Sequence, residues 1–143
     1  MKPPEPFVWF VDRSLGRKIV NDLRAAGFQI EEHETLFADN APDDEWLGEA
    51  GRRGWVVLTK DKAVRRNALE LAAILASQVA CFSLANGNLS AVQMAKAFLT
   101  ARPRMEKALR RFLPPITASV TKTGNVSVLM AEGKLLPQPK AIK

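Results

Sequence analysis

Acidic residues occur at three points of the chain, each at the end of a predicted strand or the start of a predicted helix. They are Asp12, the cluster Asp43, Asp44 and Glu45, and Asp61. Mg²⁺ and Mn²⁺ prefer oxygen ligands, and a few carboxylates from separate elements suffice to hold such an ion. A metal held in this way activates water and stabilises the charge of a phosphate. The three points predict a divalent-metal site if the fold brings them together.

The elements around these acids alternate between strands and helices. In chain order, the sequence predicts a strand over residues 7–11, a helix over 15–26, a weaker strand over 28–32, a helix from Pro42, a strand over 55–59, a helix over 67–77, a strand over 79–84, a long helix from Ser90, and strands over 116–121 and 125–130. Strands separated by helices indicate a parallel sheet with right-handed crossovers, whose sites form beyond the carboxyl ends of the strands. We expect Asp12 and Asp61 to lie on that edge.

The end of the chain carries weaker signals. Pro103 interrupts the long helical pattern, so we expect a kink there or a second segment from Met105. The last two strands form a hairpin at the edge of the sheet or beside it. A length of 143 residues with 47% apolar content suits one domain with a sizeable core. We expect that domain over residues 1–130 and a loose basic tail over 131–143.

The net charge of +6 is distributed unevenly along the chain. Residues 1–61 hold eight Lys and Arg against twelve Asp and Glu, whereas residues 62–143 hold thirteen against three. The acidic half carries the candidate metal site, and the basic half could attract a polyanion. No apolar run approaches the roughly 20 residues that span a bilayer, and the start lacks a signal-peptide core. We therefore expect a soluble, cytoplasmic protein.

Each acid also has an ordinary structural interpretation. Asp43 before a helix is most often an N-cap, and the two acids after it complement the helix dipole. Asp12 follows five apolar residues near the core, where an unpaired carboxylate is costly, so it is either functional or paired with Arg13 or Lys18. Asp61 could belong to a charged turn.

The basic residues and the histidine have similar alternatives. Lys and Arg residues flank Asp61, and their placement beside the acid favours contact with a substrate phosphate over a merely solvated face. Further positive charge lies on the long helix, where it would neutralise phosphates without sequence selectivity. His33 could act as a general base, but a solvated or locally paired side chain is the more common case. Cys81 stands alone, and we expect a small core residue.

Three strings of the sequence are together similar to a known family. They are VDRSLGR at 11–17, PDDEWL at 42–47 and LTKDK at 58–62. The strings resemble the PIN-like domains of VapC-like toxin/antitoxin ribonucleases, over about Phe7 to Leu84. The resemblance implies a three-layer α/β/α domain with a central, mostly parallel sheet, to which the C-terminal β-hairpin is added. It also implies a metal-dependent endoribonuclease using Mg²⁺ or Mn²⁺, restrained by a cognate antitoxin protein, and a possible homodimer.

The resemblance assigns roles to individual residues. Asp12 matches the acid of the first strand, Asp43 the acid that opens the middle helix, and Asp61 the acid of the Thr-x-Asp segment, while Asp44 or Glu45 could substitute for Asp43. Candidate contacts to RNA are Arg13, Lys60, Lys62, Arg65 and Arg66. The family often has a fourth acid on a later strand. No acid comes directly after the predicted strand over 79–84 here, and Glu70 is the nearby candidate, so a single ion or a degenerate site stays open.

Two other classes of protein fit parts of the pattern. A phospho-acceptor receiver domain also places acids at strand ends, but it needs an acidic pair after the first strand and a lysine after a late strand. Here Arg13 follows Asp12, and Ala85 and Asn86 follow Leu84. A non-catalytic module that binds RNA or a protein through the basic half remains the main alternative.

Overall fold

A computed structural model of the chain describes residues 2–60 and 68–143, without the side chains of residues 34, 43 and 68–71. The described elements are β1 (Val8–Val11), the 3-10 turn η1 (Arg13–Leu15), α1 (Arg17–Ala25), β2 (Gln29–Glu32), α2 (His33–Leu36), α3 (Asp43–Arg53), β3 (Val56–Thr59), α5 (Ala68–Ser77), β4 (Ala80–Leu84), α6 (Ala91–Arg111), β5 (Ile116–Val120), β6 (Val126–Ala131) and β7 (Lys134–Ile142). The alternation of strands and helices predicted from the sequence is confirmed.

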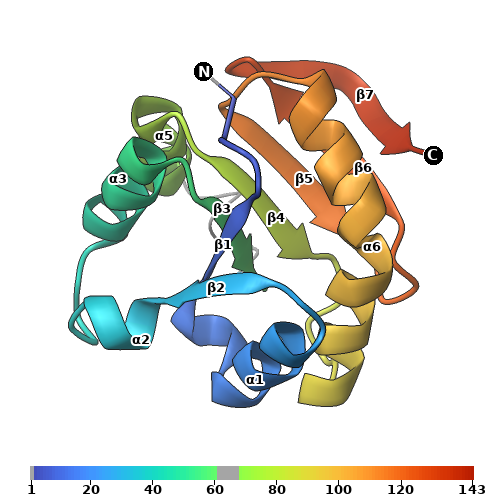
Figure 1. Cartoon of the computed structure of the whole chain (residues 1–143). Helices are drawn as coiled ribbons and strands as arrows, with labels where there is room; N and C mark the ends of the chain where they lie inside the picture. Colours follow the sequence, from blue (N-terminus) through green and yellow to red (C-terminus); the bar gives the residue numbers. More distant parts are fainter. Residues whose placement is uncertain (1, 61–67) are drawn as a thin grey trace.

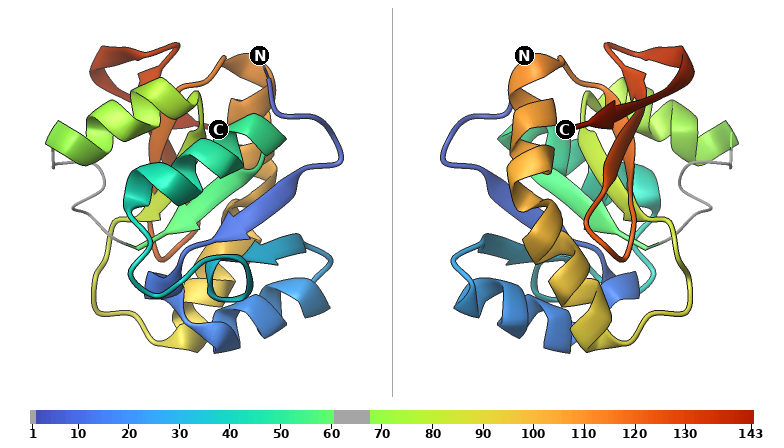
Figure 2. Two further views of the ribbon diagram at one scale, coloured as in Figure 1. Left: turned by 90° about the vertical axis from the view of Figure 1, so that its left-hand side faces the viewer. Right: turned by 90° about the vertical axis from the view of Figure 1, so that its right-hand side faces the viewer.

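The described strands form one sheet in the order β2-β1-β3-β4-β5-β6-β7. The pairs from β2 to β5 are parallel, whereas β6 and β7 add antiparallel strands (Figure 1). Helices α1 and α6 lie against one another on one face of the sheet, and α3 and α5 lie together on the other (Figure 2). The expected three-layer α/β/α architecture with a mostly parallel sheet is therefore confirmed.

Alternate residues of the strands enter two apolar layers. Trp9 of β1 packs on the side of α1 and α6, whereas its neighbour Phe10 packs on the side of α3. The ring of Phe10 stacks on those of Trp46 and Trp55, with centroid separations of 5.6 Å in both cases. Because successive strand residues point to opposite faces, Asp12 belongs to the same face as Phe10. The apolar layer between the sheet and α3 therefore lies on the same face of the sheet as Asp12.

The start of α3 differs in one detail from the expectation. Pro42 occupies the N-cap position, and Asp43 is the first helical residue and not the cap. Gly54 ends the helix in the left-handed conformation, with φ of +71°. A Cβ at Gly51 would lie 1.8 Å from the backbone oxygen of Ser77, so α3 and α5 approach each other more closely than a larger residue permits.

Helix α6 is one element from Ala91 to Arg111, so the expected second segment at Met105 is wrong. Pro103 lies inside the helix, where it removes one backbone hydrogen bond. The cost is offset by packing, because Ala101 and Met105 on either side are completely buried. Ser90 starts the helix as predicted, and it forms a capping box with Gln93. No helix in the described part combines the length and apolar character needed to cross a bilayer.

The expected loose tail after Ala131 is also wrong. The predicted hairpin of β5 and β6 is present, but a further turn at Glu132 and Gly133, with φ of 55° and 77°, leads into β7. β7 pairs along β6 and is the last strand of the sheet. Most of its side chains are exposed, whereas Ile142 is only 4% exposed and joins the core. A strand with so few buried positions gives little apolar alternation in the sequence.

The role of β7 can be tested by shortening one buried side chain. Ile142→Ala should lower the free energy of unfolding by about 2 to 4 kcal/mol, because a buried aliphatic side chain is lost from the core. Leu135→Ala on the same strand is the matched control, since Leu135 is 72% exposed and its truncation should cost less than about 0.5 kcal/mol. Urea unfolding measures both values. Equal, small effects would mean that the end of the chain does not contribute to the core.

Candidate functional site

The parallel topology places the end of β1, the start of α3 and the end of β3 at one edge of the sheet. Asp12 directly follows β1, and its backbone N–H donates to the carbonyl oxygen of Leu58 in β3 at 3.1 Å. A helix that connects two parallel strands runs back across the sheet, so α3 begins at the edge where the strands end. The start of α3 at Asp43 and the end of β3 at Thr59 are thus placed at the edge that carries Asp12 (Figure 1).

Two hydroxyl groups hold the carboxylate of Asp12. Its Oδ2 accepts hydrogen bonds from Thr59 Oγ1 at 2.7 Å and from Ser14 Oγ at 2.9 Å. The two hydroxyl oxygens lie 3.3 Å apart, and the backbone N–H of Lys60 points to Ser14 Oγ at 3.5 Å. In contrast, Asp12 Oδ1 has only a long contact of 3.5 Å with the backbone N–H of Ser14. One carboxylate oxygen is therefore fixed, while the other keeps its capacity to accept or ligate.

The cations that the sequence offered as partners of Asp12 are paired elsewhere. Arg13 forms an ion pair with Asp39 at 2.6 Å, and Lys18 contacts Asp22 at 3.8 Å on α1. The structure thus pairs neither Arg13 nor Lys18 with Asp12, and the alternative of such a pair is set aside. Neutral hydroxyls hold this half-buried carboxylate through Oδ2, an arrangement that suits a metal ligand.

His33 is the second neighbour of Arg13, in addition to Asp39. Its Nδ1 accepts from Arg13 Nε at 3.2 Å, and its ring centroid lies 6.2 Å from Phe10, 5.4 Å from Phe37 and 5.7 Å from Trp46. The residue is only 3% exposed. The expectation of local pairing is confirmed, whereas a solvated side chain is excluded. An imidazole that accepts at Nδ1 is engaged with Arg13 and does not face a reacting water through that nitrogen.

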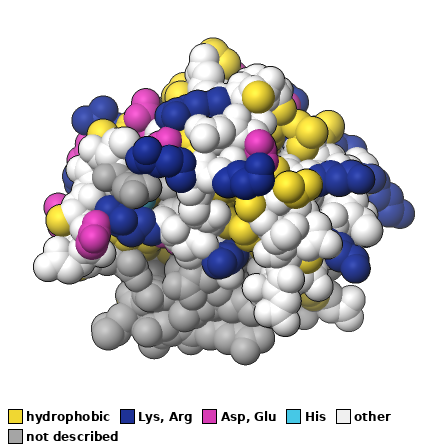
Figure 3. Space-filling view, turned by 90° about the horizontal axis from the view of Figure 1, so that it is seen from below, with side chains coloured by type: hydrophobic (Ala, Val, Ile, Leu, Met, Phe, Trp, Pro, Cys, Tyr) yellow, Lys and Arg dark blue, Asp and Glu magenta, His cyan; other side chains and the backbone are white. Residues whose placement is uncertain are grey.

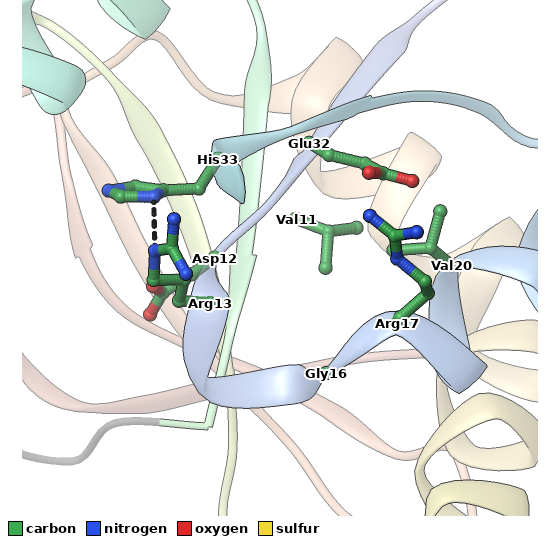
Figure 4. A pocket seen from close by; sticks show the side chains of 8 residues that line it. All are labelled: Val11, Asp12, Arg13, Gly16, Arg17, Val20, Glu32 and His33. Carbon is green, nitrogen blue, oxygen red and sulfur yellow. Dashed lines mark hydrogen bonds between the residues drawn. The ribbon is translucent and has the colours of Figure 1, made fainter. Parts of the chain in front are cut away.

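A small pocket opens beside Asp12 on the side of α1 and β2 (Figure 4). Its lining residues are Val11, Asp12, Arg13, Gly16, Arg17, Val20, Glu32 and His33. The cavity of about 20 Å³ has room for a water or a few atoms of a larger group, but not for an aromatic ring. On its wall, the buried carboxylate of Glu32 is paired with Arg24 at 3.0 Å. The pocket suits a small polar or anionic group that contacts the guanidinium groups of Arg13 and Arg17 in its lining.

The structure describes only some of the other predicted site residues. Asp44 and Glu45 are exposed on α3, and among the described residues no three potential metal ligands of the Asp, Glu, His or Cys type form a cluster. Asp43 has the expected position at the start of α3, but its side chain is not described. Lys60 is half-buried next to Ser14. The predicted residues Asp61, Lys62, Arg65 and Arg66 lie outside the described residues.

Most of the positive charge on α6 has structural partners. The guanidinium of Arg102 lies 4.4 Å from the ring centroid of Phe28 and pairs with Glu106 at 3.3 Å. Arg110 pairs with Glu5 at 2.7 Å, and this hydrogen bond lowers the pKa of the Glu5 carboxyl. The contacts with Phe28 and Glu5 attach the long helix to other parts of the chain, so they favour a structural role for the two arginines over contact with a substrate.

The end of the molecule toward which β1 and β3 run is nevertheless basic (Figures 1 and 3). Figure 3 views the end of the molecule that points down in Figure 1, where Lys and Arg side chains predominate over Asp and Glu among the described residues. A surface of this kind attracts polyanions and raises their local concentration.

Sequence reasoning missed two residues of the Asp12 network. Thr59 ends an apolar strand just as Asp12 follows one, and Ser14 stands two residues after the acid, where a hydroxyl commonly bonds an Asp side chain. Both signals were present in the sequence. Without the register between β1 and β3, however, neither signal identifies the carboxylate as the shared partner.

Comparisons with known proteins identify the family of the chain. A family model described as "PIN like domain" matches residues 7–86, more than half of the chain. A Mycobacterium tuberculosis protein named "Putative ribonuclease VapC45" is 30% identical over 125 residues, which cover 84% of this chain and 90% of that protein. No solved structure matches significantly. The region that matches the family model runs from β1 past β4 and includes Asp12, Ser14 and Thr59; the chain therefore belongs to the PIN-like domain family.

Proposed function

We propose that this protein is a metal-dependent endoribonuclease, the toxin of a toxin/antitoxin pair, which hydrolyses RNA phosphodiester bonds at an Mg²⁺ or Mn²⁺ site. The observation that carries the proposal is the Asp12 carboxylate, held through one oxygen by Thr59 and Ser14 at the edge where β1 and β3 end. The PIN-like family and a relative named as a ribonuclease support the same activity. Because the chain belongs to the PIN-like family, we do not pursue the alternative of a phospho-acceptor receiver domain.

The donor set of the site fits a hard divalent cation. Asp12, Asp43 and Asp61 would supply carboxylate oxygens from three elements, with Asp44 or Glu45 as substitutes for Asp43. Two hydroxyl bonds on Oδ2 leave Oδ1 of Asp12 available to such an ion. When bound, Mg²⁺ or Mn²⁺ lowers the pKa of a coordinated water and stabilises negative charge on a phosphate.

The side chains of the chain itself have distinct tasks in this proposal. Thr59 and Ser14 keep the Asp12 carboxylate in one orientation, which is the usual task of groups that bond a metal ligand. Arg13 and Lys60 contribute positive charge next to the acid and would contact phosphates of the RNA. Lys62, Arg65 and Arg66 are proposed to do the same. A cognate antitoxin and a homodimer are the partners that we propose from the family.

Asp12→Asn should abolish metal-dependent cleavage, because an amide is a much weaker ligand than a carboxylate. With a labelled structured RNA, the rate in Mn²⁺ or Mg²⁺ should fall by about 100-fold or more, while circular dichroism stays unchanged. Asp22→Asn on α1 is a matched control, since Asp22 contacts only the exposed Lys18 among the contacts described above. EDTA should stop the wild-type enzyme. Cleavage that is absent or equal in all samples would favour a non-catalytic RNA- or protein-binding module with a degenerate site.

Removing the hydroxyl of Thr59 should weaken metal binding while the strand is preserved. Thr59→Val keeps the shape of the side chain but deletes the hydrogen bond to Asp12 Oδ2, so we expect about 10- to 100-fold weaker activation by Mn²⁺. Thr59→Ser retains a hydroxyl and should remain close to the wild type. The concentration of Mn²⁺ that gives half-maximal cleavage measures the effect. If both variants activate equally, Thr59 has no part in holding the acid.

A further inference from the structure

Arg13 is held on two sides by residues that have no assigned function. Its Nε donates to Nδ1 of His33 at 3.2 Å, and one Nη group pairs with Asp39 at 2.6 Å. A guanidinium carries five N–H donors, and among the described residues no partner is found for the second Nη group. Arg13 also lines the pocket that opens beside Asp12 (Figure 4). The arginine is thus oriented at the site with donors to spare.

The contact with His33 is the rigid one of the two. His33 is buried, and its ring packs among Phe10, Phe37 and Trp46, so the position of Nδ1 is fixed by the core beneath it. Since an arginine N–H can donate only to a nitrogen with a free lone pair, Nδ1 carries no proton. A hydrogen bond to a charged donor, made away from water, is also stronger than one at the surface.

The contact with Asp39 is the replaceable one. The Asp39 side chain is 90% exposed, whereas that of Arg13 is 30% exposed. An ion pair with one partner almost fully in water is weak and is screened by salt. A phosphate offers the same kind of acceptor as a carboxylate and binds a guanidinium through two parallel hydrogen bonds. A phosphate that approaches Arg13 can therefore take the place of Asp39 without disturbing His33.

We propose that Arg13 binds a phosphate of the RNA strand next to Asp12, that His33 is the positioning residue for its guanidinium, and that Asp39 occupies the place of this phosphate in the free protein. The inference rests on the proposed function in taking RNA as the ligand. It assigns opposite effects to the two neighbours of Arg13. His33 promotes binding because it orients the arginine, whereas Asp39 opposes binding because it competes for the same donors.

Binding of a fluorescein-labelled single-stranded RNA in EDTA, followed by anisotropy over a range of salt concentrations, tests the inference without cleavage. Arg13→Ala should weaken binding about ten-fold and reduce the salt slope by about 0.7, the value for one lost phosphate contact on a single strand. Asp39→Asn should instead tighten binding by about two- to five-fold. The ion pair between Lys18 and Asp22 on α1 provides charge-matched controls. Lys18→Ala should leave the salt slope unchanged, and Asp22→Asn should not tighten binding.

The positioning role of His33 is tested with two replacements. His33→Leu keeps an apolar side chain but removes the acceptor, and it should weaken binding about as much as Arg13→Ala. His33→Asn places an amide oxygen near the position of Nδ1 and should restore most of the affinity. The Arg13→Ala, His33→Leu double variant should bind no more weakly than Arg13→Ala alone. Independent, additive losses would show that His33 affects only the fold and would overturn its assigned role.

The single histidine of the chain gives a readout that does not depend on RNA. In a ¹⁵N-resolved NMR spectrum of the imidazole, Nδ1 should be unprotonated and Nε2 protonated, and Arg13→Ala should shift the Nδ1 signal. A protonated Nδ1 would contradict the bond to Arg13. Loss of metal-dependent cleavage with these binding effects intact would count only against the proposed nuclease. Wild-type protein that does not bind RNA, or an Asp39→Asn variant that binds no better than Asp22→Asn, would overturn the inference.

Discussion

The parallel, in-register pairing of β1 with β3 is the constraint on which the site depends. It places Val11 opposite Leu58, so the next two residues, Asp12 and Thr59, are neighbours across the strands. A slip of one residue would turn Thr59 to the other face of the sheet and remove its bond to the acid. The slip is prevented by the core, since both faces of these strands are packed with large apolar side chains. The orientation of one carboxylate is therefore determined by the burial of the whole sheet.

Much of the fold could be predicted from the sequence because its signals are local and strong. The apolar runs of β1 and β3, the helical spacing of α1 and the capping box at Ser90 each specify an element within a few residues. Two features could not be read in this way. Pro103 is a strong local signal against a helix, but burial of its neighbours outweighs it. β7 has only a few packed side chains, so its position depends on hydrogen bonds to β6 that leave no pattern in the sequence.

The candidate site shows the same division between local and tertiary information. The position of Asp12 after a strand was sufficient to predict that it lies at the carboxyl edge. Its partners were not predictable, because a nearby cation is an obvious choice by sequence, whereas the structure uses the hydroxyl of Thr59 from another strand. For His33 the sequence left a solvated or a locally paired side chain open, and the structure shows the paired one. Only the fold reveals that Phe10 of β1, Phe37 after α2 and Trp46 of α3 surround it.

The strands at the two ends of the sheet affect how the molecule behaves at high concentration. An unpaired strand edge can recruit a strand from another copy, which leads to edge-to-edge aggregation. β7 is nine residues long, but Pro137 and Pro139 lack backbone N–H groups, and they lie where the register with β6 shifts. β2 at the opposite end is only four residues long. Both ends of the sheet are thus poor templates for a further strand, which keeps a largely apolar seven-stranded sheet from growing between molecules.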